Sequence, residues 1–441
     1  MQTASPTDHD DPSILDLIAD RPALCMHALD GLMLEGVPLA QVARKVGTPA
    51  WVLSAGTLRS RLAALQDAFA ATGAHVHYAV KANDHLAVLR LMRAGGAGAD
   101  VVSRGELLRA QEAGIAPDRI VFSGVGKTVA DMTAAIAADI AQINVESAEE
   151  LEMLSALASG LGRSARVALR INPDIDAGTH EKITTGRADT KFGIALADVP
   201  GLYAHAARLP GVAPQGLALH IGSQIASMRP YRTAYARAAE MVGTLRTAGL
   251  AVHTMDCGGG LGIRYRDEAA ATPNAFAGAI DQAFGGLDLQ LMIEPGRWLA
   301  GPAGLLLASV VLTKTTGPHR FLVLDAAMND LVRPAMYEAW HGIVPLSPSD
   351  ARAPTAPVNV VGPVCETGDT FARSRAMPAL NPGSFVAILD TGAYGSVMSS
   401  TYNARPLAAE VLVEGTRWAT IRPRQDLAAL WRDETMPDWP R

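Results

Sequence analysis

Eight short β-branched or apolar runs, each followed by a longer amphipathic stretch, occupy the chain from about residue 75 to 295. This alternation is typical of βα units. Eight such units in one compact region predict a (β/α)8 barrel, whereas the competing open doubly wound sheet normally uses fewer strands. The runs are His75 to Val80, Gly98 to Val102, Arg119 to Ser123, Ala141 to Val145, Ala165 to Ile171, Gly216 to Ile221, Val252 to Asp256 and Leu287 to Ile293.

The pattern changes after Arg297, where strand-like runs are separated by Gly, Pro and Asp rather than by long helices. This texture predicts a second, mainly antiparallel β domain. Gly31 to Leu34 is expected to add a strand to it, so that the barrel is an insertion. We therefore expect a flexible extension over residues 1–20, a barrel over 49–302, and a β domain formed by 21–48 and 303–441. The later runs are Leu305 to Val311, Phe321 to Leu324, Val358 to Val361, Phe385 to Leu389, Glu410 to Val413 and Trp418 to Ile421.

The composition of the 441-residue chain excludes several classes of protein. Its 49% hydrophobic content supports substantial cores, and a net charge of -6 provides no basic surface for nucleic acid or an anionic membrane. The longest stretches without charged residues are interrupted by proline and glycine, and the polar, acidic N-terminus differs from a signal peptide. The three cysteines have no metal-ligand spacing and form no disulfide framework. We expect a soluble cytoplasmic protein without a metal.

The catalytic groups of such a barrel lie in the loops after the strands, so the residues that end each run matter most. Lys81 ends the first run in Y-A-V-K-A-N. A partly desolvated lysine near other cations can have a depressed pKa and form an imine with an aldehyde. Taken alone, Lys81 is better explained as an ordinary surface lysine, so the assignment depends on the other motifs. His220 ends the sixth run, and Glu294 to Arg297 (E-P-G-R) ends the eighth.

The seventh run ends in the glycine-rich segment Gly258 to Gly262. Backbone amides without side chains can approach a phosphate closely, and barrels often bind phosphate after strands seven and eight. A plain turn is the alternative, and no dinucleotide fingerprint is completed here. Together, a lysine, a phosphate nest, a flat histidine that faces a ring and a glutamate that keeps a pyridine nitrogen protonated describe a pocket for pyridoxal phosphate.

The second domain adds Arg333 to Tyr337, Cys365 to Asp369 and Gly392 to Gly395 at predicted strand ends or turns. Arg333 offers a fork of donors to a carboxylate, and Glu366 offers a charge to an ammonium. A substrate with a second amino-acid terminus would satisfy both. Cys365 beside Glu366 favours a protonated thiol that delivers a proton. Taken alone, Cys365 is better explained as a buried structural cysteine.

At these residues the chain resembles the diaminopimelate decarboxylases, fold-type III pyridoxal phosphate enzymes related to ornithine decarboxylase and alanine racemase. The resemblance extends from about residue 30 to 425. It is carried by the ordered motifs YAVKAN, GADVVSRGEL, INPD, THEKITTG, KFGI, HIGSQ, GGGLG, EPGR, DAAMNDLVRPAMYEA, GPVCETGD and GAYGSVMSSTYNARP.

The resemblance implies decarboxylation of meso-diaminopimelate at its D-centre to L-lysine. Lys81 would carry the cofactor, and Cys365, His220 and Glu294 would share in catalysis. Cys365 and Glu366 would complete the partner's site in a homodimer. The cofactor would be bound by Lys81, His220, Ser223, Gly259, Gly260, Glu294, Pro295, Gly296, Arg297 and Tyr394, and the substrate by Arg297, Arg333, Tyr337, Glu366 and Tyr394.

The residues alone are also compatible with two other functions. The first is decarboxylation of another amino acid, such as D-ornithine, D-lysine or a specialised-pathway substrate. The carboxylate clamp of Arg333 and Tyr337 argues against a substrate without a distal carboxylate, because the buried charge would be unmatched. The second is a catalytically silent regulatory relative, which intact Lys81, Glu294, Arg297 and Cys365 argue against.

Overall fold

A closed ring of eight parallel strands forms the centre of the larger domain in the computed structural model, which describes residues 11–178, 180, 182, 185–187 and 189–439. The ring is closed by pairing of the last strand with the first and of the fourth with the fifth. The predicted fold class is thereby confirmed. In order, the strands are β5 (His75–Ala79), β6 (Gly98–Val101), β7 (Ile120–Phe122), β8 (Gln142–Val145), β9 (Ala165–Asn172), β11 (Val212–Ala218), β12 (Thr254–Asp256) and β13 (Gln290–Ile293).

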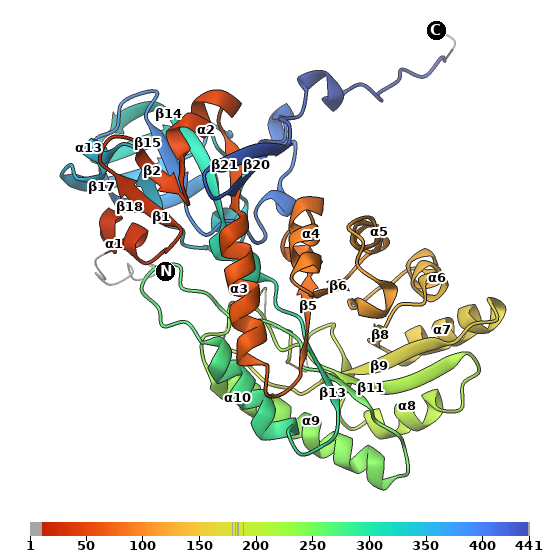
Figure 1. Cartoon of the computed structure of the whole chain (residues 1–441). Helices are drawn as coiled ribbons and strands as arrows, with labels where there is room; N and C mark the ends of the chain where they lie inside the picture. The colour runs from red at the N-terminus through yellow and green to blue at the C-terminus, as the bar shows by residue number, and fades with distance from the viewer. Residues whose placement is uncertain (1–10, 179, 181, 183–184, 188, 440–441) are drawn as a thin grey trace.

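Helices surround the ring (Figure 1) and bury its outer face. They are α3 (Ala55–Ala68), α4 (Leu86–Ala94), α5 (Arg104–Glu112), α6 (Val129–Ala138), α7 (Ala148–Gly160), α8 (Val199–Ala206), α9 (Met228–Thr247), α10 (Pro273–Phe284) and the short α11 (Arg297–Ala300). Short β10 (Ile194–Ala195) pairs with β9. No helix of the described chain is long and apolar enough to cross a bilayer.

Serine caps begin two of these helices, α5 and α7. The amides of Glu106 and Glu150 donate to the hydroxyls of Ser103 and Ser147, each at 3.2 Å. A complete capping box would add a bond from the serine's own amide to the glutamate carboxylate, and neither helix has it among the described residues. Each glutamate carboxylate instead accepts from the residue before the cap, at 2.8 Å for Val102 and 3.3 Å for Glu146. Each glutamate thus binds the backbone amide near the end of the preceding strand and does not bind the amide of the serine.

Polar side chains fill much of the barrel interior. Thr254 donates to Gln142 at 2.9 Å, Gln142 donates to Asn144 at 2.8 Å, and Asn144 donates to Asp256 at 2.8 Å. Because β8 and β12 are not neighbours in the ring, these bonds cross its interior. An aliphatic interior would need no partners, whereas these buried groups satisfy one another. The chain of hydrogen bonds ends at the carboxyl ends of the strands, where the site lies.

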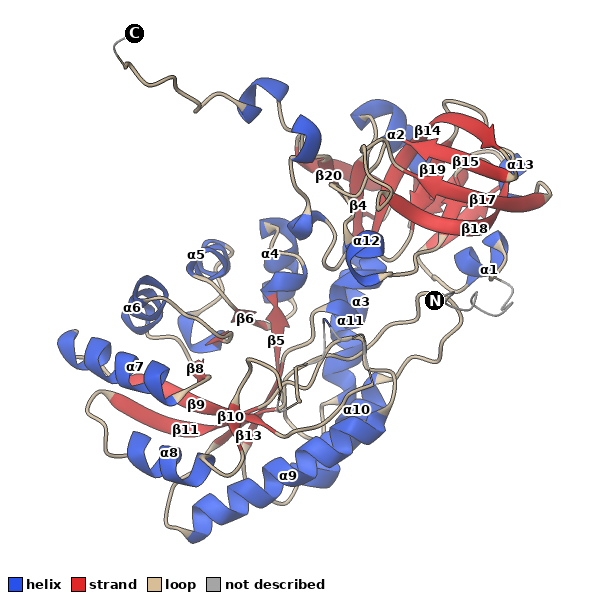
Figure 2. Ribbon diagram, turned by 180° about the vertical axis from the view of Figure 1, so that it is seen from behind, coloured by secondary structure: helices blue, strands red, loops and turns tan. Residues whose placement is uncertain are grey.

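The second domain combines segments from both ends of the chain, as Figures 1 and 2 show. Its main sheet has the order β18-β17-β15-β14-β4-β20-β21, with β19 pairing β14 and β16. Its pairs are antiparallel except for β15 with β17 and β20 with β4. The strands are β4 (Ala50–Ser54), β14 (Gly304–Thr316), β15 (His319–Leu324), β16 (Ile343–Pro345), β17 (Thr355–Val361), β18 (Thr370–Pro378), β19 (Phe385–Ile388), β20 (Ala409–Glu414) and β21 (Arg417–Arg422).

The remaining elements belong to this β domain too. Gly31 to Leu34 forms a strand as expected, but within a separate three-stranded sheet of β1 (Leu24–His27), β2 (Gly31–Leu34) and β3 (Val37–Pro38). Helices α2 (Leu39–Val46), α12 (Arg333–Tyr337) and α13 (Pro348–Ala351) complete the domain.

Two expected domain limits differ from the structure. β4 pairs with β14 and β20, so residues 50–54 lie in the β domain rather than in the barrel. The described part of the expected flexible extension contains α1 (Ile14–Ala19). Ile14, Leu17 and Ile18 are buried in the β-domain core, so this part of the extension is a packed helix.

Candidate active site

Lys81 directly follows β5 and faces carboxylates. Its Nζ lies 2.5 Å from Oδ2 of Asp100 in β6, and 33% of the lysine side chain is exposed. Burial lowers the pKa of Lys81, but the negative charges of Asp100 and Glu294 have the larger combined effect. They raise the pKa of Lys81 above its ordinary value. The expected depression of this pKa by nearby cations is therefore wrong, because the loops place carboxylates around the amine.

Glu294 directly follows β13 and lies within a group of buried acids. Ser123 donates to its Oε1 at 3.1 Å. Burial, then repulsion from Asp100 and Asp256, raises the pKa of Glu294 well above its usual range. Asp256 is held by the amides of Asn144 at 2.8 Å and Gly258 at 3.0 Å. Like charges in a dry site cannot both ionise, so Glu294 retains a proton beside Asp256.

His220 is fixed from both its ring and its backbone. The Gly259 amide donates to its Nδ1 at 3.2 Å, and Thr185 donates to its carbonyl at 2.8 Å. Burial, together with the Arg170 charge, keeps its pKa well below the ordinary value. The ring is thus neutral with its proton on Nε2. The ring is therefore available as an uncharged flat surface.

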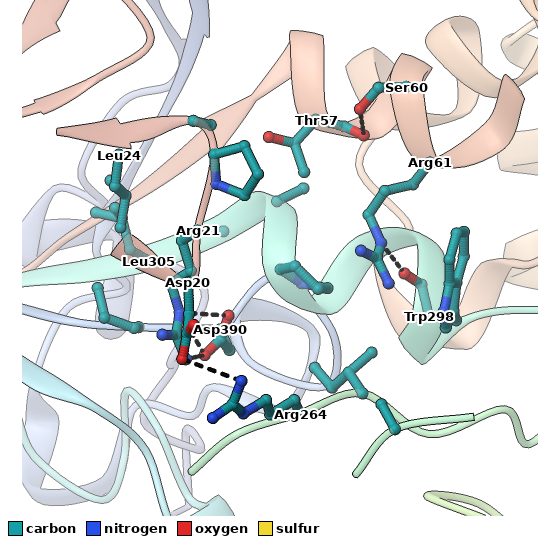
Figure 3. Close-up of a pocket in the computed structure, with 18 of the residues that line it drawn as sticks. Asp20, Arg21, Leu24, Thr57, Ser60, Arg61, Arg264, Trp298, Leu305 and Asp390 are labelled. Atoms are coloured by element: carbon teal, nitrogen blue, oxygen red, sulfur yellow. Dashed lines mark hydrogen bonds and ion pairs between the residues drawn. The ribbon is translucent and has the colours of Figure 1, made fainter. Parts of the chain in front are cut away.

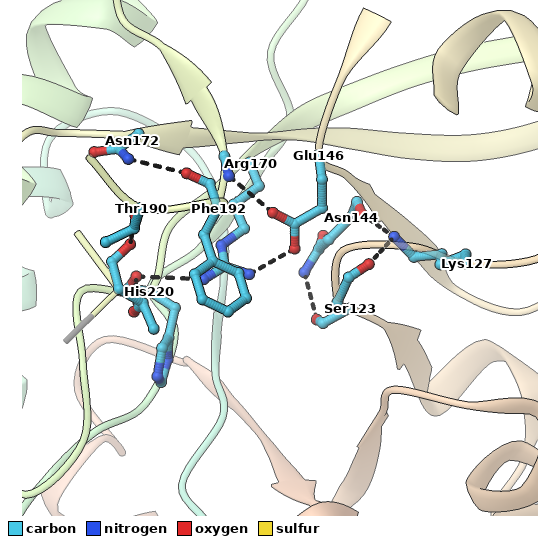
Figure 4. A network of polar contacts seen from close by, with 12 residues as sticks. Ser123, Lys127, Asn144, Glu146, Arg170, Asn172, Thr190, Phe192 and His220 are labelled. Atoms are coloured by element: carbon cyan, nitrogen blue, oxygen red, sulfur yellow. Dashed lines mark hydrogen bonds and ion pairs between the residues drawn. The ribbon is translucent and has the colours of Figure 1, made fainter. Parts of the chain in front are cut away.

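A buried ion pair supports the wall next to His220 (Figure 4). Arg170 Nη1 donates to Glu146 at 2.6 Å, and Glu146 accepts from the Gly193 amide at 2.9 Å. The Arg170 guanidinium stacks 4.9 Å from the ring centre of Phe192. This pair ties the K-F-G-I segment to the end of β9. Four residues of the neighbouring T-H-E-K-I-T-T-G motif, at positions 179, 181, 183 and 184, lie outside the described residues.

A cavity of about 380 Å³ brings Lys81, His220 and Glu294 together. Its size lies within the range of ordinary small-molecule sites, roughly 300–1,000 Å³. Ser123, Asn144 and Asp256 line it as well. The cavity therefore joins the amine, the neutral ring and the protonated carboxyl that the sequence singled out.

Two glycines of the glycine-rich loop, Gly258 and Gly259, use their amides within the protein, although their amides were expected to bind phosphate. The amides of Gly258 and Gly259 already donate to Asp256 and His220. A Cβ on Gly259 would lie 2.0 Å from the Glu294 carbonyl oxygen, and one on Gly260 would lie 2.2 Å from that of Gly222. These glycines thus let the loop pack against neighbouring backbone. Within the described chain, the Gly260 amide donates to no acceptor.

The open Gly260 amide lies in a region with further donors. Arg297 Nε and Nη2 donate to Ser223 Oγ at 3.2 and 3.0 Å, and its guanidinium stacks 4.8 Å from the ring centre of Tyr394. The Tyr394 amide donates to the Ala82 carbonyl at 2.8 Å, which ties the second domain to the lysine loop. An amide, a hydroxyl and a guanidinium are the donor types that bind phosphate.

The E-P-G-R loop packs directly on the lysine loop. The Ala79 amide donates to the Pro295 carbonyl at 3.2 Å. A Cβ on Gly296 would approach the side chains of Ala82 and Ala79 within 3.0 and 3.1 Å. Pro295 and Gly296 therefore set the distance between the two loops.

Arg297 and Arg333 form a pair of buried cations around Tyr265. Arg297 Nη1 donates to the Tyr265 hydroxyl at 2.8 Å, and the Arg333 guanidinium lies 5.2 Å from the centre of the same ring. They are 6% and 5% exposed. Neither forms an ion pair with a carboxylate of the described residues. A second cavity of about 420 Å³ is lined by both arginines and Tyr337. Two buried charges without a counterion are suited to an anionic ligand.

Cys365 and Glu366 lie away from both cavities. Both are exposed, and Glu366 accepts a hydrogen bond from Tyr402. A single protomer therefore does not bring them to Lys81. Sequence reasoning also missed Tyr265, His341 and Asp100. Asp100 is a charged residue in the middle of the predicted second run and within a quoted motif, so its position offered a signal.

The site fits pyridoxal phosphate by its donor chemistry. An open amide with a hydroxyl and a guanidinium suits the phosphate, a retained carboxyl proton suits a ring nitrogen, and Lys81 supplies an amine. Lys81, His220 and Glu294 would hold the ring, with Ser223, Gly260, Arg297 and Tyr394 near the phosphate.

Comparison with known proteins agrees with this assignment of the cofactor. Residues 55–301 match the family described as pyridoxal-dependent decarboxylase, pyridoxal binding domain. The chain is 47% identical over 413 residues to a diaminopimelate decarboxylase of Zymomonas mobilis, covering 92% of this chain and 97% of that one. It is 44% identical over 405 residues to that of Pseudomonas aeruginosa, with 92% and 97% covered.

Solved structures show the same relationship. The structure of diaminopimelate decarboxylase from Helicobacter pylori complexed with L-lysine has a TM-score of 0.86 and 38% identity, covering 89% of this chain and 98% of that one. The enzyme from M. jannaschii has a TM-score of 0.90 and 33% identity, with 95% and 99% covered. The chain therefore belongs to the diaminopimelate decarboxylase family of pyridoxal-dependent enzymes.

Proposed function

We propose that this protein decarboxylates meso-diaminopimelate at its D-centre and releases L-lysine and carbon dioxide. One observation carries the choice of substrate. Arg297 and Arg333 are buried around Tyr265 without a carboxylate partner in the described chain, and Arg297 stacks on Tyr394, whose amide donates to the lysine loop at Ala82. A distal carboxylate would neutralise them, whereas ornithine or lysine would leave both charges unmatched.

The residues of the chain divide the work. Pyridoxal phosphate, when bound, supplies the electron sink that stabilises the carbanion left by loss of carbon dioxide. Glu294 holds a proton for the ring nitrogen, and His220 presents its neutral ring to the face of the cofactor. Arg333, Arg297 and Tyr337 hold the distal end of the substrate, and this anchor selects which bond at the reacting carbon is broken.

We further propose a cytoplasmic homodimer in which Cys365 and Glu366 enter the partner's site. Cys365 would donate the proton to the reacting carbon, and Glu366 would bind the distal ammonium. Their exposure on the protomer supports this role. The projecting C-terminal segment (Figure 1) also exposes large apolar side chains, which is typical of interaction surfaces. These are Leu427, Trp431, Met436 and Trp439. All three cysteines are free, which suits a reducing compartment.

A substrate panel tests the proposal. Carbon dioxide release is measured from meso-diaminopimelate, lysine and ornithine with the wild-type protein and Arg333→Met. We expect release only from diaminopimelate, and a loss of roughly 100-fold in kcat/KM for the variant, the scale of one charged hydrogen-bonded contact. Faster release from ornithine or lysine would overturn the choice of substrate. Lys81→Ala is the companion variant and should lose both turnover and the absorbance of the bound cofactor.

A further inference from the structure

A third cavity, of about 570 Å³, is lined by residues of both domains (Figure 3). It is bordered by the segment after α1, by α3, by the loop after the glycine-rich segment, and by α11 with the start of β14. Leu24, Ile263, Trp298 and Leu305 contribute to its apolar wall. The loop at 263–266 separates it from the cavity of the arginine pair, because Ile263 and Arg264 line this cavity and Tyr265 lines the other.

Four arginines line the cavity, and three of them have carboxylate partners. Arg21 pairs with Asp390, Arg264 pairs with Asp20 at 3.2 Å, and Arg266 pairs with Asp11 at 3.2 Å. The fourth, Arg61, forms no ion pair with any described residue. Arg61 is therefore the one arginine of this lining without a carboxylate partner among the described residues. The Glu35 carboxylate, which also lines the cavity, accepts from the Ser54 hydroxyl and the amides of Gly56 and Gly415.

Arg61 is held in place by one hydrogen bond and one stacking contact, both with Trp298. Its Nε donates to the Trp298 carbonyl, and its guanidinium lies 3.8 Å from the centre of the Trp298 ring. In the part of the chain that the structure describes, neither Nη atom has a hydrogen-bond acceptor. Burial lowers the pKa of Arg61 to about 10, so the group stays charged at neutral pH. A fixed, charged fork with free donors is suited to a carboxylate.

We propose that this cavity is a regulatory site for a small apolar monocarboxylate. Arg61 binds the carboxylate through its two free nitrogens, and the apolar wall receives the hydrocarbon body. An amine would meet the unpaired guanidinium as a like charge, and a neutral alcohol would leave that charge uncompensated.

The position of Arg61 connects the site to the substrate anchor. Arg61 contacts Trp298 on α11, and the preceding residue Arg297 donates to Ser223 and Tyr265. We therefore expect a ligand on Arg61 to shift Trp298 and, with it, the adjacent residue Arg297 on α11. We expect occupancy to change the KM for the substrate more than kcat.

The test uses the holoenzyme with butanoate, hexanoate and octanoate as probes, and with octylamine and octanol as controls. Binding is measured by calorimetry for the wild type, Arg61→Met and Arg61→Lys. Arg59→Met is the matched control, because Arg59 lies on the same helix but pairs with Glu414 at 2.6 Å outside the cavity. Cofactor absorbance verifies that each variant is folded.

We expect saturable binding of at least one carboxylate, weakened about ten- to a hundredfold by Arg61→Met and unchanged by Arg59→Met. Arg61→Lys should retain part of the affinity through its charge. Equal binding to wild type and Arg61→Met, equal binding of octylamine, or no binding of any carboxylate would overturn the site. If the wild type binds a carboxylate but the KM for the substrate is the same at saturation, the regulatory role is overturned.

Discussion

Arg333 is a buried cation whose hydrogen-bond partner is a neutral ring. Its Nε donates to His341 Nε2 at 3.3 Å, and His341 Nδ1 lies 2.8 Å from the Leu389 carbonyl. A carbonyl only accepts, so the proton of His341 is on Nδ1 and Nε2 is free to accept. Burial and the Arg333 charge keep the pKa of His341 well below its ordinary value. His341 thus orients Arg333 without adding charge.

Replacing His341 by leucine should therefore raise the KM for diaminopimelate by about tenfold with a smaller effect on kcat, because the anchor loses its orientation. Steady-state kinetics on meso-diaminopimelate measures both constants. His341→Gln, which keeps an acceptor near Arg333, should restore most of the affinity. A fall in kcat alone for the leucine variant would contradict an orienting role.

His77 lies in the barrel interior, and its ring limits stability in acid. It is 3% exposed, and its Nδ1 has no partner in the described chain. Burial, followed by the Arg119 charge, lowers its pKa from 6.5 to about 4. Between these values the unfolded chain binds more protons, so the free energy of unfolding rises with pH. The stabilisation is complete above 6.5 and is lost as the pH falls toward 4.

His77→Gln should accordingly flatten the pH dependence of stability over this window, by up to ~3 kcal/mol. Urea unfolding at a series of pH values measures it. His319→Gln, at an exposed position on β15, is the control and should follow the wild type. An unchanged slope in the His77 variant would show that other groups cause the acid sensitivity.

The strands of the barrel could be predicted because each is a short buried run followed by an amphipathic helix. β4 could not be assigned in the same way. All five of its residues are buried and a helix follows it, so its local pattern equals that of a barrel strand. Only its pairing with β14 and β20, which are remote in sequence, places it in the other domain. β16 and β18 were missed for the related reason that their partners, not their composition, define them.

In the candidate site, too, local sequence predicts the residues but not the contacts that they make with remote parts of the chain. Lys81, His220, Glu294 and Arg297 could be predicted because strand ends converge in a barrel. Their charge environment could not, since it depends on which side chains meet across the ring. Lys81 illustrates this, because Asp100 from the neighbouring strand reverses the expected direction of its pKa.

The glycine-rich loop offers a test at the scale of an element. A Cβ on Gly259 would meet the Glu294 carbonyl, so Gly259→Ala should displace the loop beside Arg297, weaken cofactor binding and cost roughly 1–3 kcal/mol of stability. Thermal unfolding and cofactor titration measure these effects. Gly278 in α10 has open space around its Cβ position, so Gly278→Ala should be neutral or slightly stabilising. Equal behaviour of the two variants would contradict the packing argument.

For the whole molecule, the proposed dimer predicts complementation between two inactive variants. Co-expression of Lys81→Ala with Cys365→Ala should restore roughly a quarter of wild-type activity, because half of randomly formed dimers are mixed and each has one intact site. Differently tagged chains allow the mixed dimers to be isolated and assayed. Mixed dimers without activity would contradict shared sites, and full activity of the cysteine variant alone would remove Cys365 from proton transfer.

The pairing of β4 also has a consequence for synthesis. During translation this strand leaves the ribosome early, yet its antiparallel neighbour begins at residue 304 and its parallel neighbour at residue 409. The barrel between them can close first, since domains fold as units in the order of their synthesis. Until β14 and β20 are synthesised, β4 is an apolar segment of the nascent chain with both edges unpaired. Such a segment is suited to binding by a chaperone.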